Sequence, residues 1–140
     1  MLAYATTFET LSSYFQNKWA ISYNDVSIAW PNVPFSPPSP PSAWVRFNII
    51  DGECAYKSVG APGKNVSRYV GQVIVQVFIP AHTGSILGLK LADFICSIFR
   101  NRQIENIRFS STYSQRVDTS LVDGWLQYNL TAPFTRDEFE

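Results

Sequence analysis

Histidine and paired carboxylates are the side chains that most often carry acid–base chemistry near neutral pH, and this chain has few of them. Its one histidine, His82, precedes an apolar helical pattern and has no recognisable nucleophile or carboxylate motif beside it. Asp51 with Glu53, and Asp137 with Glu138, are the nearest carboxylate pairs, and both lie in polar segments. We interpret His82 as a helix-start or surface residue and the carboxylates as solvated charges. The sequence therefore predicts no catalytic residue and no enzyme.

The residues that could bind a metal ion or a phosphate group lack the necessary spacing. Cys54 and Cys96 are too far apart for a zinc motif such as C-x-x-C. The segment Gly60–Asn65 resembles the end of a phosphate-binding loop, but that loop needs an earlier glycine where Ser58 stands and a Ser or Thr after Lys64. We therefore predict no metal site and no cofactor.

The charge balance limits the possible partners. Among 140 residues, 11 Lys and Arg balance 11 Asp and Glu, and no basic cluster is denser than Arg100 with Arg102. A duplex-binding surface would need a basic stripe that releases counterions from phosphates. No apolar run approaches the roughly 20 residues that span a bilayer, and no Lys or Arg precedes Lys18 as in a signal peptide. We expect a soluble protein made in the cytoplasm, with reduced cysteines and no membrane partner.

The first third of the chain predicts one helix and a stiff connector. Apolar residues recur at helical spacing: Phe8, Leu11, Phe15 and Trp19. With Thr6 and Glu9 as a capping box, the pattern predicts a helix over Thr6–Lys18. A short β-prone run at Val26–Trp30 follows. Six of the nine prolines then fall within residues 31–42, which predicts a surface connector in extended geometry.

Two strands with period-two patterns follow, separated by a polar segment. Ala43–Ile50 alternates, and Tyr69–Ile79 places Val73 and its i+2 neighbours on one face and glutamines on the other. We expect the second face of that strand to be covered partly, by a helix or a neighbouring subunit. Residues 51–68 contain Gly52, Gly60 and Gly63, so we expect an extended hairpin arm or a long mobile loop.

The last third predicts a second helix and the closing strands. Gly84–Arg100 has helical apolar spacing that includes Leu87 and Leu91, with Thr83 as its expected N-cap. Strands are expected at Ile107–Tyr113 and Leu121–Phe134, before a frayed tail at residues 136–140. We therefore predict a single domain over residues 1–140, of the α+β class, with a largely antiparallel or mixed sheet packed by two helices.

Several segments together resemble the tail terminator, or tail completion, family of tailed bacteriophages. The resemblance rests on the order and pattern of four segments, and it covers about two thirds of the chain. The segments are Val26–Pro34 with its Ile28–Asn32 centre, Trp44–Phe47, Tyr69–Arg100 and Gly124–Tyr128. It implies a virion structural protein that forms a homohexameric ring at the head-proximal end of the tail tube. Such a ring stops tube polymerisation and provides the docking surface for the head-tail connector or stopper protein, while DNA passes through its channel without sequence-specific binding. Assembly would take place in the host cytoplasm.

Candidate interface residues can be chosen with that ring in mind. We expect contacts with another subunit or the tube from eight side chains: Trp44, Lys57, Lys64, Arg68, Tyr69, Gln72, Gln76 and Trp125. The three basic residues could pair with carboxylates of a partner, or they could be ordinary solvated charges. The alternative function is a nucleic-acid- or peptide-binding module that uses an aromatic sheet face, since exposed aromatic side chains can stack on bases. That alternative lacks an accompanying basic groove.

Overall fold

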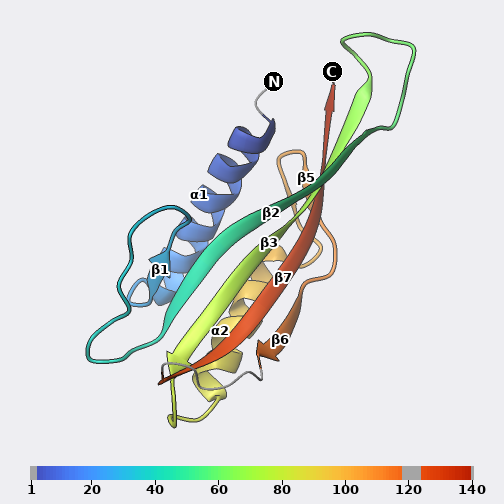
Figure 1. Ribbon diagram of the computed structural model, residues 1–140. Helices are drawn as coiled ribbons and strands as arrows, with labels where there is room; N and C mark the ends of the chain where they lie inside the picture. Colours follow the sequence, from blue (N-terminus) through green and yellow to red (C-terminus); the bar gives the residue numbers. More distant parts are fainter. Residues whose placement is uncertain (1–2, 118–123, 140) are drawn as a thin grey trace.

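The computed structural model describes residues 3–117 and 124–139, and within them it contains two helices and one seven-stranded sheet (Figure 1). In chain order the elements are α1 (Ala3–Tyr23), β1 (Ser27–Ala29), β2 (Trp44–Tyr56), β3 (Val66–Pro80), α2 (Ile86–Phe99), β4 (Gln103–Ile104), β5 (Ile107–Phe109), β6 (Tyr113–Val117) and β7 (Trp125–Phe139). The α+β class predicted from the sequence is confirmed.

The sheet is mixed, with its three long strands in the centre. The strand order is β1-β2-β3-β7-β5-β4, and β6 pairs with β7 beside β5. β1 runs parallel to β2, whereas each of the other described pairs is antiparallel. A parallel pair needs a long connection, and residues 31–42 supply it without forming a helix or strand of their own. Ser39 and Pro40 are joined by a cis peptide bond there.

Both helices lie on the same face of the sheet, behind β2, β3 and β7 in the view of Figure 1. The predicted alternation is confirmed on β3, where Val73, Val75, Val77 and Ile79 face the helices and are fully buried. Phe47 on β2 and Leu130 on β7 extend this core across the sheet. Because side chains alternate between the faces of a strand, the odd-numbered residues of β3 define one buried layer.

Helix α1 supplies an aromatic stripe to this core. Leu11, Phe15 and Trp19 are buried, and the Phe15 ring lies 5.2 Å from that of Phe47. The helix is longer than predicted at both ends, because it spans Ala3–Tyr23 rather than Thr6–Lys18. The capping-box prediction was therefore wrong.

Helix α2 corresponds to the second predicted helix but begins at Ile86 and ends at Phe99. Ser85 occupies the N-cap position, so the prediction of Thr83 was wrong; the Thr83 hydroxyl instead donates to the Pro80 carbonyl oxygen at 2.7 Å. The prediction that Leu87 packs on the sheet was also wrong, because Leu91 and later residues form the buried stripe while Leu87 is 46% exposed.

The closing strands differ from the prediction in two places. The strand expected over Ile107–Tyr113 is divided, with β5 pairing to one half of β7 and β6 to the other. The expected last strand begins at Trp125, and residues 121–123 lie outside the described part of the chain. The tail predicted to fray is instead strand through Phe139, paired with β3.

Residues 51–68 continue the pairing of β2 with β3 and are called here the distal hairpin. The register extends to Tyr56 opposite Ser67, with an irregularity between Asp51 and Cys54. Residues 57–65 connect the strands and include Gly60 and Gly63, which have positive φ angles of 95° and 81°. In Figure 1 this hairpin projects beyond both helices, at the upper right.

Candidate functional site

The sheet face opposite the helices, called here the open face, carries several of the residues predicted to form contacts. Its central rows are set by strand register: Arg46, Gln76 and Asn129 form one row, and Asn48, Ile74 and Thr131 form the next. The Gln127 side-chain amide donates to the Asn129 Oδ1 atom at 2.8 Å. Within these two rows Arg46 is the only charged residue. The centre of the open face is therefore rich in amides and poor in charge.

Gln72 and Gln76 lie on the open face as expected, but Tyr69 does not. Because Tyr69 differs from them by an odd number of positions, its side chain lies on the helix-facing side. There its ring contacts that of Tyr4 edge-on, with the centroids 5.4 Å apart. Tyr69 therefore belongs to the packing of α1 against β3.

Aromatic residues cluster at the lower end of the open face. The Trp44 ring stacks on that of Phe78, with the centroids 4.1 Å apart and the planes 11° from parallel. The Phe35 ring also packs against Trp44, with the centroids 4.9 Å apart. Trp125 lies edge-on to Trp44 at 6.0 Å. The guanidinium of Arg46 lies 5.3 Å from the Trp44 ring centroid, within the range of a cation–π interaction. These contacts bring the two predicted tryptophans together.

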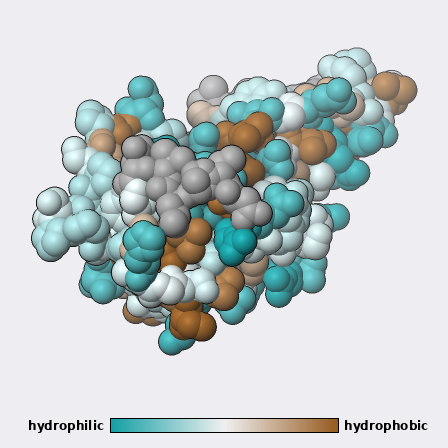
Figure 2. Space-filling model, turned by 60° about the horizontal axis from the view of Figure 1, so that its bottom comes forward, coloured by the Kyte–Doolittle hydropathy of each residue, from teal (hydrophilic) through white to brown (hydrophobic). Residues whose placement is uncertain are grey.

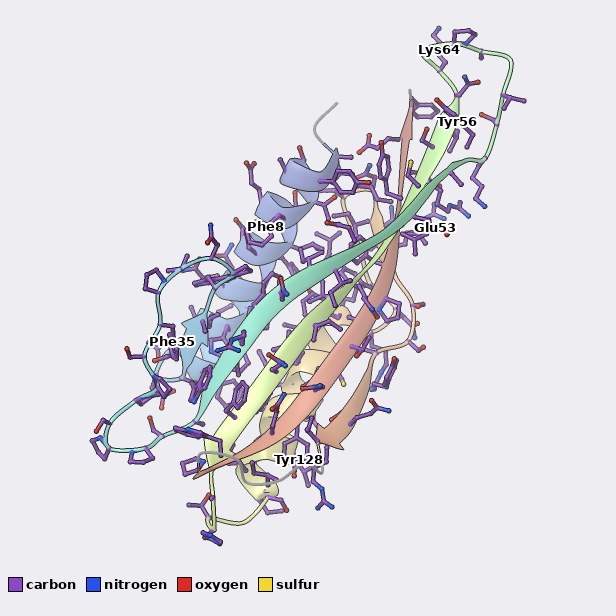
Figure 3. The ribbon with its side chains drawn as sticks, viewed as in Figure 1. Phe8, Phe35, Glu53, Tyr56, Lys64 and Tyr128 are labelled. Carbon is purple, nitrogen blue, oxygen red and sulfur yellow. The ribbon has the colours of Figure 1, made fainter. Side chains whose placement is uncertain are left out.

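Trp44 itself presents little surface in the single copy. Its side chain is only 4% exposed, since Phe78 and the connector residue Phe35 cover it. Trp125 is half-buried. Figure 3 shows Phe35 in the connector beside the lower end of β2. The aromatic cluster thus anchors the proline-rich connector to the sheet, and it offers little ring surface on which a base could stack.

The distal hairpin carries the predicted basic residues, but they are not equivalent. Lys57 and Lys64 are exposed, and Figure 3 shows Lys64 with Tyr56 and Glu53 along the projecting part. Arg68 instead donates two hydrogen bonds to the Asp137 carboxylate, from Nε at 2.8 Å and from Nη2 at 2.9 Å. Arg68 therefore fastens β3 to β7.

The electrostatics around Asp137 agree with this geometry. The hydrogen bond from Arg68 is the main cause that lowers the pKa of the Asp137 carboxyl, and partial burial opposes it. The positive charges of Arg68, Arg108 and Lys57 lower that pKa further. Because both side chains of the pair are more than a third exposed, solvent screens much of the interaction.

A buried ion pair on the other side of β7 was missed at the sequence level. Arg136 and Glu138 are 6% and 7% exposed, and the Arg136 Nε atom donates to Glu138. Arg136 also donates to the Thr7 hydroxyl on α1 at 2.9 Å, while the Asn106 amide donates to Glu138 at 3.1 Å. This network joins α1, β7 and the turn between β4 and β5. The available signal was the i, i+2 spacing of the two charges, which continues the alternation of β7.

The residues considered for chemistry do not converge. Within residues 3–117 and 124–139 there is no group of three His, Cys, Asp or Glu side chains that could hold a metal ion. Cys54 is exposed, whereas Cys96 is buried, and burial raises the pKa of its thiol. His82 has a positive φ of 65° in the turn after β3. Neither described helix is long and apolar enough to cross a membrane.

Comparison with known proteins identifies one family. Residues 8–120 match the family model described as "Phage tail terminator protein". One solved structure, whose title describes no function, aligns over 100% of this chain and 99% of its own length, with a TM-score of 0.73 and 15% sequence identity. At that identity the likeness supports the fold alone. No curated protein matches the sequence.

Proposed function

This chain belongs to the phage tail terminator family, and from that premise we propose that it forms a homohexameric ring on the head-proximal end of the tail tube. Membership makes it a structural component of a bacteriophage tail and of the virion. In the proposal, one surface of the ring binds the last tube subunits and stops further polymerisation. The opposite surface docks the head-tail connector or stopper protein. The family match over residues 8–120 carries this proposal.

The shape of the subunit supports the proposal. A ring requires heterologous contacts, in which two different patches of each copy meet. The distal hairpin and the open face are two such patches, because one projects past the helices and the other spans the centre of the sheet (Figure 1). Lys57 and Lys64 on the distal hairpin are exposed and would pair with carboxylates of the tube or a neighbouring copy.

The amide-rich open face is compatible with a channel through which DNA passes. Side-chain amides such as those of Gln76 and Asn129 form hydrogen bonds without adding charge, so they would not hold the phosphate backbone strongly. The alternative, a nucleic-acid- or peptide-binding module, depends on an exposed aromatic face. The burial of Trp44 removes the best candidate for that face. We therefore prefer the ring to the binding module as the proposed function.

The mass of the purified protein, alone and mixed with its tail tube protein, tests the ring. Light scattering after size separation should give a six-subunit species in at least one sample. A persistent monomer that ignores tube protein but retains a labelled oligonucleotide would support the binding module instead.

The role of the distal hairpin can be tested in the same assay. Exchanging Lys57 or Lys64 for glutamate, each in its own variant, should weaken tube binding, because both side chains are exposed on the distal hairpin. Lys18→Glu on α1 is the matched control, since it makes the same change of charge at an exposed site on a helix. Binding by both variants equal to that of the control would remove these lysines from the interface.

A further inference from the structure

We propose that the open face contacts the phosphate backbone of double-stranded DNA through two unpaired arginines, Arg46 and Arg108. This inference rests on the proposed ring, and it names the surface of each copy that would face DNA in the channel. It follows from the way the strands distribute charge between the two faces of the sheet. Counted along the chain, the 11 basic and 11 acidic residues cancel, and that count conceals the distribution.

Strand register assigns each paired charged residue to a face of the sheet, because residues directly opposite one another share a face. On the helix-facing side, two arginines balance two carboxylates: Arg116, Arg136, Asp51 and Glu138. On the open face, three arginines accompany a single carboxylate: Arg46, Arg68, Arg108 and Asp137. Glu53 lies in the irregularity of β2 and has no register partner. The paired residues of the open face therefore carry a net positive charge, whereas those of the helix-facing side cancel.

The three arginines of the open face are not equally available to a partner. Arg68 donates two hydrogen bonds to its carboxylate partner on β7. Arg46 and Arg108 are exposed, and neither forms an ion pair within the described part of the chain. The rings of Trp44 and Phe78 position the Arg46 guanidinium, which lies 5.3 and 5.8 Å from their centroids. The open face thus keeps two cations that no carboxylate of the same copy neutralises.

The rows between the two arginines add hydrogen-bonding groups without adding negative charge. Arg46 lies in the row of Gln76 and Arg108 in the row of Val70, six positions apart on β3, which is about 20 Å along the strands. The two intervening rows contain amide, hydroxyl and apolar side chains: Asn48, Ile74, Thr131, Tyr113, Ile50, Gln72 and Pro133. In Figure 2 the surface toward the distal hairpin, at the upper right, is likewise a mixture of hydrophilic and hydrophobic side chains. Amides and hydroxyls contact phosphate oxygens in many protein–DNA complexes.

The separation of the two arginines favours a DNA backbone over an acidic protein surface as the partner. An acidic protein would need carboxylates at two points about 20 Å apart. Duplex DNA carries one charge per roughly 1.7 Å of its axis, so it would meet both arginines in any register. The Trp44 ring is buried, so the open face offers little surface for stacking on bases. Contacts with the backbone alone carry no sequence information, as the passage of DNA of any sequence requires.

Binding of a labelled DNA duplex of mixed sequence by the full-length protein tests this contact. The affinity should fall as the salt concentration rises, because phosphate contacts release counterions. Arg46→Gln and Arg108→Gln should each weaken binding roughly tenfold at about 50 mM salt. Each should also lower the slope of log affinity against log salt concentration by about one. Arg46→Lys keeps the charge and should bind nearly as well as the unaltered protein.

Arg102→Gln is the matched control, since it removes one positive charge on the other side of the sheet. Arg102 is exposed, and its carbonyl oxygen accepts a hydrogen bond from the backbone N–H of Phe109, whose side chain is buried on the helix-facing side. This variant should leave the affinity and the slope unchanged. Circular dichroism should be the same for all variants, because each altered side chain is exposed.

The outcomes separate this inference from the ring itself. If Arg102→Gln weakens binding as much as the open-face variants do, total charge sets the affinity and the proposed contact is wrong. If the unaltered protein binds no duplex while Arg46→Gln weakens binding to tube protein, the partner of the open face is an acidic protein and not DNA. Light scattering of the same samples reports the ring: rings that bind no duplex would refute the DNA contact alone. Monomers that bind the duplex through these arginines, even with tube protein present, would refute the ring alone.

Discussion

The two halves of the long β2–β3 hairpin are built on different principles. In the lower half, odd-numbered residues such as Val75 and Val77 are fully buried beneath the two helices. In the distal hairpin, Tyr56 and Val59 are 65% and 84% exposed. Backbone pairing holds its two strands together, and the Arg68–Asp137 pair joins β3 to β7. Stability therefore resides in the lower half. The distal half adds exposed surface with little core, which is expected of a segment kept for contacts with other molecules.

The largest predicted effect is in the lower half. Phe15→Ala should reduce the free energy of unfolding by about 3–5 kcal/mol, because the ring is fully buried and packs against those of Trp19, Phe47 and Phe99. Urea denaturation followed by fluorescence measures the change. Phe8→Ala, at a position 36% exposed on the same helix, is the control and should cost less. Equal losses would contradict the assignment of the core to this half.

The second largest expected effect concerns the buried ion pair of Arg136 with Glu138, at the junction between the two halves. Arg136→Met would leave the carboxylate of Glu138 buried without its ion-pair partner, so unfolding should become easier by about 3 kcal/mol. The loss of stability should lie at the lower end of the range for broken buried ion pairs, because the Asn106 amide still donates a hydrogen bond to Glu138. Arg108→Met, an exposed arginine on the neighbouring strand, is the control for thermal denaturation. An unchanged melting temperature for Arg136→Met would show that the network does not hold α1 to the sheet.

The smallest effect concerns the distal half. Because Arg68 lowers the pKa of Asp137, the pair contributes stability above the ordinary carboxyl pKa, and the contribution is lost as the pH falls through the lowered value. Asp137→Asn should shift the urea midpoint slightly downward at pH 6, and the difference from the unaltered protein should shrink at pH 3. Solvent exposure keeps the effect small. A difference that stays constant with pH would rule out an electrostatic origin.

The sequence predicts well wherever one face of an element is buried. The buried residues Val45 and Phe47 on β2, Val73 on β3, and Leu11 with Phe15 on α1 repeat with the period of their element, so burial and strand or helix type followed from the pattern. The structure of the last residues of β7 was harder to predict, because in the sequence alone Arg136 and Glu138 look like solvent-exposed charges. Their pairing depends on contacts with α1 and on β4–β5, which a local pattern does not contain.

The candidate contact residues were harder to predict than the core. The alternation of β2 places Trp44 on the open face, but a tertiary contact with Phe35 in the connector buries its side chain. Arg68 has the sequence context of a free basic side chain, but it lies across from Asp137, 69 residues later. The positions of Gln72 and Gln76 followed directly from strand period. Local period thus predicts which face a side chain occupies, whereas long-range contacts decide whether it remains available.

The most direct test of the central claim is whether this protein stops tail tube growth from one end. Tubes assembled from purified tube protein would be imaged by electron microscopy, with and without this protein carrying a gold label. The account predicts shorter tubes with label at a single end. Tubes of unchanged length, or label distributed along their sides, would contradict it.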